Sequence, residues 1–206
     1  MPGSQSNETS IANLCLTRLG ADRITNIDTE QTENASKIRA VFDFLRDEVL
    51  RSHPWNFAVQ RVNFNKLTTT PLYGFSAEFQ IPGNVLRILP QGTGSDSNLA
   101  SEYKIEGDKV LTNDGTFQCK CILRIEDTTK WDAAFVEVFA TRLQAELAYA
   151  IINNRGVASD LFNLYLSKLR AAKAYDAMED TPDQLTADEW LSSRSSGTFA
   201  PNSSLT

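Results

Sequence analysis

The sequence predicts an α+β protein, mainly a helical bundle with an inserted small antiparallel β subdomain and an extended C-terminal arm. Apolar residues recur at helical spacing up to residue 56 and again from residue 132, whereas short alternating segments with turn residues lie between them. Beyond residue 180 the chain is mostly polar. We therefore assign residues 1–56 and 127–180 to the bundle, 57–126 to the β insertion and 181–206 to the arm.

The composition is that of an acidic globular chain. Its 206 residues include 20 basic and 26 acidic side chains, which give a formal net charge of −6. A chain of this length buries roughly 70% of the surface that its unfolded form exposes, so its core requires neither a disulfide nor a metal. The acidic balance argues against a protein that mainly grips nucleic-acid phosphates. Trp55, Phe57 and Phe64 are interleaved with basic residues, but we expect them in the core rather than stacked on nucleic acid.

Two helices are predicted in the first part of the bundle. The first covers residues 10–19, with Thr9 or Ser10 as its N-cap and Gly20 just beyond its end. The second gives the clearest helical pattern in the chain, with an apolar stripe opposite charged residues. It ends before Pro54, because the residue before a proline avoids helical angles. The apolar stripe consists of Ala35, Ile38, Val41, Phe42, Leu45 and Val49.

Two further helices are predicted in the second part of the bundle. The first of them follows Asp132 as N-cap and extends to about residue 153, with apolar residues on two sides that place it at the centre of the bundle. The other covers residues 158–178. The connection between them is short, which favours an antiparallel helical hairpin.

Several short strands are predicted between the two helical pairs. Gly107 and Asp108 join two of these strands in a type II′ or related two-residue turn. Residues 91–101 are polar and rich in glycine and serine, which is typical of a mobile loop. The predicted strands are residues 57–64, 78–81, 85–89, 103–106, 109–111 and 119–125.

The C-terminal arm carries spaced apolar residues, Trp190, Leu191 and Phe199, in an otherwise polar stretch. Such a segment alone buries too little apolar surface to offset the entropy lost on ordering. Two interpretations remain open. The arm is either a disordered tail or a partner-binding segment whose three apolar side chains fill pockets on a neighbouring molecule.

Scarce residues argue against a metal site. The sequence has one histidine, His53, and three cysteines, Cys15, Cys119 and Cys121. A structural zinc site requires four Cys or His ligands, which here would come from three separate segments, so we expect no metal. The odd cysteine count fits reduced thiols. Cys119 and Cys121 point to one face of a predicted strand, where we expect small core side chains.

We expect no enzymatic activity and no cofactor. A phosphate-binding loop, a dinucleotide fingerprint and a nucleophile elbow are all missing. His53 lies at a helix end, where the helix dipole favours the imidazolium, so we interpret it as a cap. The carboxylate pairs at residues 47–48 and 179–180 fall on presumed solvated helix positions. We see no arrangement of two carboxyl groups in a cleft, as a glycosidase needs.

No targeting or membrane segment is predicted. The sequence begins MPGSQSNETS, without the basic and apolar regions of a signal peptide. The longest apolar run, residues 147–152, is far shorter than the roughly 20 residues of a membrane-spanning helix.

Several segments occur in an order that resembles one protein family. The most specific is HPWNFA at residues 53–58, which follows a charged amphipathic helix. The structural motif within it is Pro54, Trp55, Asn56 and Phe57. The other segments are residues 12–20, 46–52, 81–87, 103–107, 131–135 and 143–148. This order resembles the tail tubular protein A family, the head–tail adaptors of T7-like short-tailed phages, over roughly residues 11–178.

The resemblance implies a structural virion protein of the viral tail, with no catalytic residues to carry over. In podoviruses such a head-tail adaptor joins the portal protein to the tail nozzle, a tail tubular protein B-like protein, and lets DNA pass without specific binding. It implies a homo-oligomeric ring, a dodecamer assembled in the host cytoplasm, with a tail fibre or spike docking nearby and no membrane. The arm would then wedge against the portal, although it matches no quoted family motif.

Two other functions remain open at this point. One is a head-completion or connector protein of a long-tailed phage, which is also a structural protein. The other belongs to a different class, a small helical enzyme or nucleic-acid-binding protein. The number of copies in a ring formed with the portal would separate these alternatives.

Overall fold

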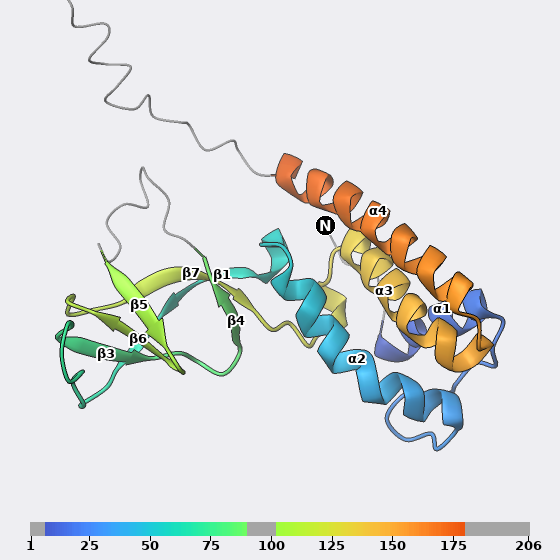
Figure 1. The fold of residues 1–206 in the computed structure, drawn as a ribbon, viewed down its shortest axis with the longest axis horizontal. Helices are drawn as coiled ribbons and strands as arrows, with labels where there is room; N and C mark the ends of the chain where they lie inside the picture. Colours follow the sequence, from blue (N-terminus) through green and yellow to red (C-terminus); the bar gives the residue numbers. More distant parts are fainter. Residues whose placement is uncertain (1–6, 90–101, 180–206) are drawn as a thin grey trace, which may run out of the picture.

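The computed structural model describes residues 7–89 and 102–179 and confirms the predicted fold class, a helical bundle with an inserted antiparallel β subdomain. Figure 1 shows the helices gathered at one end of the molecule and the strands at the other. The helices are α1 (Glu8–Leu19), α2 (Glu33–Arg51), α3 (Ala133–Ile152) and α4 (Arg155–Glu179). The strands are β1 (Val59–Asn63), β2 (Asn65–Lys66), β3 (Ala77–Gln80), β4 (Val85–Ile88), β5 (Tyr103–Glu106), β6 (Lys109–Thr112) and β7 (Gln118–Leu123).

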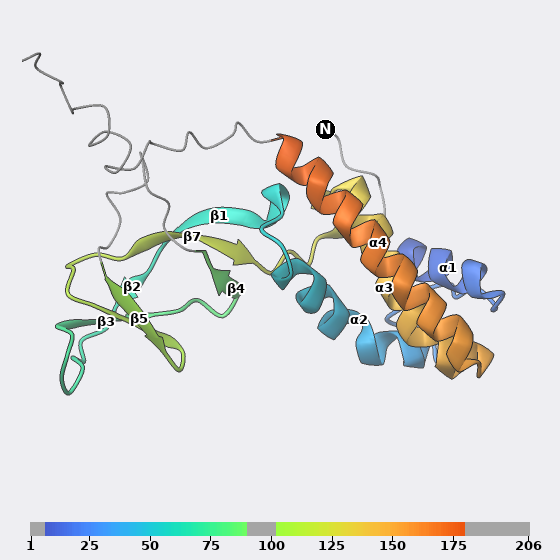
Figure 2. The same ribbon diagram turned by 45° about the horizontal axis from the view of Figure 1, so that its top comes forward.

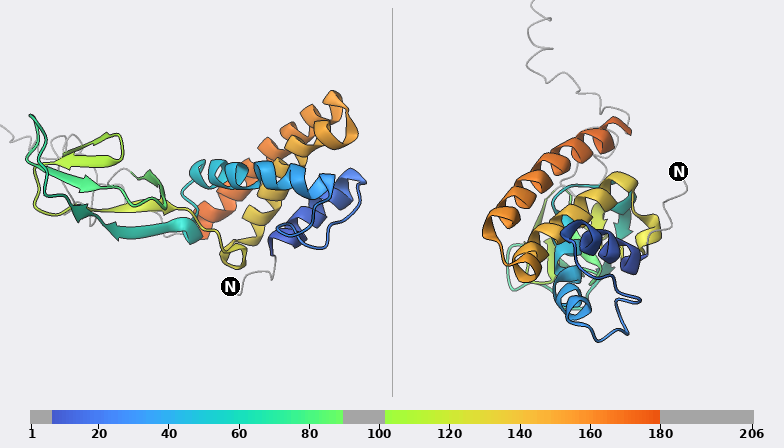
Figure 3. Two further views of the ribbon diagram at one scale, coloured as in Figure 1. Left: turned by 90° about the horizontal axis from the view of Figure 1, so that it is seen from below. Right: turned by 90° about the vertical axis from the view of Figure 1, so that its right-hand side faces the viewer.

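The chain leaves the bundle after α2 and returns before α3, so the β subdomain is an insertion. Seen from below in Figure 3, this subdomain lies at one end of the long axis and the four helices at the other. The predicted arm, residues 181–206, and the predicted mobile loop, residues 91–101, lie outside the described residues. Within the described ranges, no helix combines the length and the apolar character needed to cross a membrane.

Side-chain caps determine where the first two helices begin. Asn7, and not Thr9 or Ser10, caps α1, because its side chain accepts a hydrogen bond from the Ser10 N–H at 2.7 Å. The prediction of this N-cap was wrong because several good capping residues follow one another here. Thr32 caps α2 through its side-chain oxygen. Gly20 ends α1 with a φ of +71°, which confirms the predicted stop.

α3 lies at the centre of the bundle, as predicted, and packs against α1, α2 and α4. Asp132 caps its start. α4 returns beside α3 (Figure 2) but begins at Arg155 rather than at residue 158. The reason is that Asn153 adopts a left-handed φ of +58°, which reverses the chain within one residue. The side chain of Asn154 then accepts hydrogen bonds from the first turn of α4.

The strands form two antiparallel sheets, with the orders β1-β7-β4 and β2-β3-β6-β5. The predicted β5–β6 hairpin is present, and Gly107 has the positive φ of +62° that a type II′ turn needs at its first central position. Cys119 and Cys121 share one face of β7, with their Sγ atoms 3.4 Å apart. The buried core of this subdomain consists of Phe64, Ala77, Phe79, Val110, Phe117, Cys119, Cys121 and Leu123.

Candidate partner-binding surfaces

The segment that leaves the bundle, residues 53–58, is fixed where α2 meets the sheets. Trp55 is 1% exposed, and its Nε1 donates a hydrogen bond to the Val49 carbonyl at 3.1 Å. Its ring packs edge-on against Phe135 of α3, with centroids 5.2 Å apart, and the half-buried Phe57 contacts the same ring. The two N–H groups after Phe57 bond to the Trp55 carbonyl. This 3-10 turn delays the strand predicted from residue 57 until β1.

Asp176, near the end of α4, joins this helix to the same segment. Its carboxylate accepts a hydrogen bond from the Asn56 N–H at 3.1 Å and lies 3.0 Å from His53 Nε2. The Asn56 side chain donates to the Asp176 carbonyl at 2.9 Å. Lys173, about one turn earlier, donates to the Ser52 carbonyl at 3.1 Å. The C-terminal end of α4 is therefore held at the junction between bundle and sheets.

His53 is not the helix cap that the sequence predicted. Ser52 is the C-cap of α2, and its N–H bonds to carbonyls of the last turn. Burial lowers the pKa of His53, and the nearby Asp176 carboxylate only partly opposes this effect. The expectation of a favoured imidazolium was wrong because the ring is covered and packs edge-on against Trp55, with centroids 4.9 Å apart.

The segment that returns to the bundle is held by two further contacts. Arg124, just after β7, binds Asp47 of α2 through Nε–Oδ2 and Nη2–Oδ2 distances of 2.8 and 2.7 Å. Trp131, which is 1% exposed, donates from Nε1 to the Ile125 carbonyl at 2.9 Å and packs edge-on against Phe135. Our assignment of Asp47 to a solvated face was therefore wrong. Nothing local in the sequence shows that Arg124 returns beside α2.

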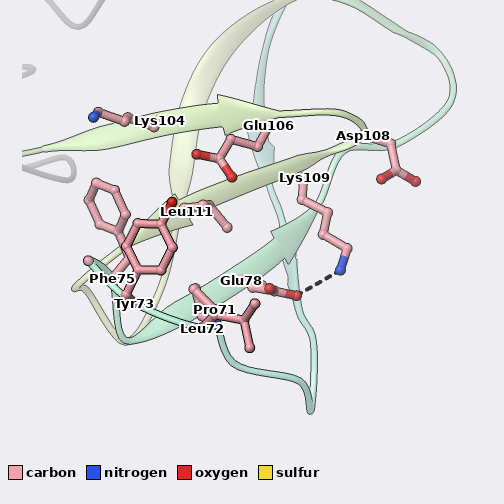
Figure 4. A pocket seen from close by; sticks show the side chains of 11 residues that line it. Pro71, Leu72, Tyr73, Phe75, Glu78, Lys104, Glu106, Asp108, Lys109 and Leu111 are labelled. Atoms are coloured by element: carbon pink, nitrogen blue, oxygen red, sulfur yellow. Dashed lines mark hydrogen bonds and ion pairs between the residues drawn. The ribbon is translucent and has the colours of Figure 1, made fainter.

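The loop between β2 and β3 carries the most exposed large apolar side chains of the described residues. Leu72 is 99% exposed and Tyr73 is 87% exposed. Figure 4 shows both beside a shallow pocket of about 500 Å³ in the β2-β3-β6-β5 sheet. The charged residues that line the same pocket are Glu78, Lys104, Glu106, Asp108 and Lys109. Because Glu78 and Lys109 pair with each other at 2.8 Å, they stabilise the sheet. An apolar loop tip of this kind is typical of a protein–protein contact.

This loop was not predicted from the sequence, although a signal was present. The run Pro71-Leu72-Tyr73-Gly74-Phe75 places large apolar residues around a glycine in a turn, where Gly74 has a φ of +83°. The helices also expose large apolar side chains. The most exposed are Phe44 on α2 and Tyr175 and Met178 near the C-terminal end of α4, which lies at the junction.

The remaining predicted site residues have the following positions. The apolar side chains of the arm, Trp190, Leu191 and Phe199, lie outside the described residues. Trp55 and Phe64 are buried, which confirms that these two belong to the core. Pro54 and Asn56 are half-buried in the junction.

The three cysteines are free and buried, and burial raises the pKa of Cys15 to about 12. In the part of the chain that the structure describes, no three His, Cys, Asp or Glu side chains gather as a possible metal site. The described surface thus exposes large apolar side chains on the β2–β3 loop and on the helices. No protein-family model matches the chain, and no curated protein matches it.

Proposed function

We propose that this chain is a ring-forming head-to-tail adaptor of a short-tailed phage, which joins the portal to the tail nozzle and lets DNA pass. The proposal is based on several segments whose order along the chain resembles the tail tubular protein A family, above all residues 53–58. Its partners are the portal protein, the nozzle, a tail fibre or spike, and further copies of the same chain in a dodecamer. It acts as a structural protein of the virion tail, without catalysis or a cofactor.

The observation that carries the proposal is the construction of the junction. An adaptor held between two partners must keep its two parts in a fixed relation, because the partners bind at different ends. The segment most specific to the family is the one that fixes the β subdomain to the bundle, through the buried Trp55 and the Asp176 contacts. Asp47 and Arg124 hold the returning segment in the same region. The outgoing segment is thus held by α2, α3 and α4, and the returning segment by α2 and α3.

The exposed apolar side chains support two separate contacts. Leu72 and Tyr73 lie at the tip of the β subdomain, whereas Phe44, Tyr175 and Met178 lie on the helices. Single exposed apolar side chains are common on the surface of a monomer, whereas two adjacent ones at a loop tip favour a contact with a protein partner. We assign the loop tip to a tail component or a neighbouring copy, and the exposed side chains of the helices to the portal side.

The net charge fits a channel that DNA must traverse. Each copy carries a formal charge of −6, so a ring of many copies presents a mostly repulsive surface to phosphates. Because acidic proteins are common, the negative charge agrees with the proposal but does not by itself identify an adaptor. It does favour passage over specific DNA binding.

The test is a count of copies in the complex with portal. We expect native mass spectrometry and electron microscopy of the purified chain mixed with a cognate portal to give a ring of twelve.

A double variant, Leu72→Asp with Tyr73→Asp, should weaken the contact made by the β subdomain. Thr68→Asp with Thr70→Asp, at exposed positions of the same loop, adds the same charge and serves as the control. A chain that remains monomeric with portal, or binds DNA instead, would contradict the proposal.

A further inference from the structure

A second groove lies on the β subdomain, between one strand of each sheet. It has a volume of about 420 Å³, and its apolar lining includes Val85, Leu86 and Ile88 of β4 and Ile105 of β5. Among the described residues, β4 pairs only with β7 and β5 only with β6, so both are edge strands. An edge strand presents unpaired backbone N–H and C=O groups. A groove of this kind accepts an extended peptide whose apolar side chains fill its apolar lining.

One end of this groove lies beside the junction. Arg51, at the end of α2, lines the groove and donates to the Leu86 carbonyl of β4. Arg87 of β4 also lines it and donates to the Arg51 carbonyl at 3.4 Å. The next residues along the chain, His53 and Asn56, are those that hold Asp176 of α4. The end of α4 and this end of the groove therefore contact the same short stretch of chain.

The length of chain after α4 is sufficient to reach the groove. The sequence continues for 27 residues beyond Glu179. An extended chain spans about 3.3 Å per residue, so the ten residues before Trp190 reach about 33 Å. A four-residue strand such as β4 is only about 13 Å long. Trp190 and Leu191 can therefore lie anywhere along the groove of the same molecule.

Charge also matches this segment to the groove. The two guanidinium groups in the lining, those of Arg51 and Arg87, bond to backbone carbonyls and have no carboxylate partner among the described residues. The only acidic side chain in the lining, Asp108, already accepts a hydrogen bond from Gln80 at 3.0 Å. The chain beyond α4 is acidic before its first aromatic residue. Its charged residues are Asp180, Asp183, Asp188, Glu189 and Arg194.

We propose that the groove between β4 and the β5–β6 hairpin is the docking site of the chain's own C-terminal arm. Trp190 and Leu191 fill the apolar part beside Ile105, and the acidic residues before them face Arg51 and Arg87. A short connection gives the arm a high effective concentration at its own groove, which favours this occupant over a second molecule. The inference concerns the isolated chain and does not depend on the adaptor role. If the arm also binds the portal, the portal and the groove compete for the same segment.

Tryptophan fluorescence tests this docking in the full-length chain. The sequence has three tryptophans, and Trp55 and Trp131 are each 1% exposed, so a neutral quencher such as acrylamide distinguishes the state of Trp190. The Trp190→Phe variant gives the signal of the two buried rings, and the difference from wild type isolates Trp190. We expect Trp190 in the wild-type chain to be quenched severalfold less than the indole of a free peptide that contains residues 183–206.

Two variants should release Trp190. Ile105→Asp puts a carboxylate into the apolar groove at a side chain that is 51% exposed, and the core does not depend on it. Leu72→Asp makes the same aliphatic-to-acid change at the pocket beside the β2–β3 loop, outside the groove, and serves as the matched control. Asp188→Lys with Glu189→Lys changes the arm alone and leaves the described fold untouched. We expect quenching to rise severalfold in the groove variant and in the arm variant, but not in the control.

Three results would overturn the proposal. Trp190 quenched in the wild-type chain as strongly as in the free peptide would show that the arm does not dock. Equal protection in wild type and in Ile105→Asp would place the arm elsewhere, with Tyr175 and Met178 of α4 as the next surface to test. Protection that disappears on dilution would show that the arm comes from a second copy. Protection that is independent of protein concentration supports docking within one chain.

Discussion

Trp55 connects three parts of the molecule at the scale of a single residue. Its ring lies between the end of α2, the start of the β insertion and Phe135 of α3, and its Nε1 bonds to the Val49 carbonyl. Trp55→Ala leaves a cavity at this meeting point, whereas the Val49 carbonyl keeps its hydrogen bonds from the N–H and hydroxyl of Ser52. We therefore expect the free energy of unfolding, measured in urea, to fall by about 3–5 kcal/mol.

The control for this prediction is Leu72→Ala, which removes an apolar side chain that is 99% exposed. We expect it to change the free energy of unfolding by less than about 0.5 kcal/mol. If both variants unfold at the same urea concentration as the wild type, Trp55 does not support the junction. An intermediate loss shared by both variants would point instead to a general effect on the β subdomain.

His53 makes the stability of the junction depend on pH. Burial lowers its pKa in the folded chain below the ordinary value of 6.5, while Asp176 raises it and Lys173 and Arg87 lower it. The unfolded state then binds a proton at a higher pH than the folded state. The contribution of His53 is thus fully present above pH 6.5 and is lost as pH falls through the lowered pKa.

We expect the free energy of unfolding of the wild type to decrease as pH falls from 7.5 to about 5.5, and His53→Gln to flatten this decrease. Glutamine keeps a nitrogen donor for Asp176 but does not titrate. Urea denaturation at several pH values measures the effect. Parallel curves for wild type and variant would assign the pH dependence to other groups.

At the scale of elements, Asp176 joins α4 to a segment 120 residues earlier in the chain. It accepts hydrogen bonds from the Asn56 N–H and faces His53. Asp176→Ala leaves these half-buried groups without their acceptor, so we expect a loss of about 1–3 kcal/mol in the free energy of unfolding. Asp160→Ala, at an exposed position of the same helix, should cost less than about 0.5 kcal/mol. Equal effects of the two substitutions would contradict a specific role for Asp176.

The elements themselves could be predicted because their patterns are local. The helical stripe of α2, the two apolar sides of α3 and the Gly107 turn follow from residues close in the sequence. The strand order β1-β7-β4 pairs segments far apart, and one sequence contains no signal for that pairing. The same reason hid the Asp176–Asn56 and Asp47–Arg124 contacts. The burial of Trp55 was predictable because large aromatic residues after a helix-stopping proline normally enter the core.

At the scale of the whole molecule, the two parts meet at a narrow junction (Figures 1 and 3). Both parts expose large apolar side chains. An exposed pair such as Leu72 and Tyr73 buries little surface in the monomer, so we propose that it contacts a partner. Because α4 ends at the junction, the chain beyond Glu179 begins between the two parts. A segment that begins there can contact partners of either part.

Deletion of residues 188–206 tests the role of this segment in assembly. The deletion removes Trp190, Leu191 and Phe199 and none of the described residues, so we expect the bundle to remain folded, as measured by far-ultraviolet circular dichroism. Aromatic side chains carry much of the energy of an interface, often about 2 kcal/mol or more each. The dissociation constant for the portal should therefore rise at least about tenfold, measured by interferometry with immobilised portal.

The matched control keeps the arm at full length and replaces Ser192, Ser193 and Ser195 by alanine, which leaves its three apolar side chains in place. We expect this variant to bind the portal like the wild type, because serine side chains contribute little to the energy of an interface. Portal binding that survives the deletion would mean that the arm has no part in attachment. The exposed Tyr175 and Met178 on α4 would then be the surface to change, because they lie on the last described turns before the arm.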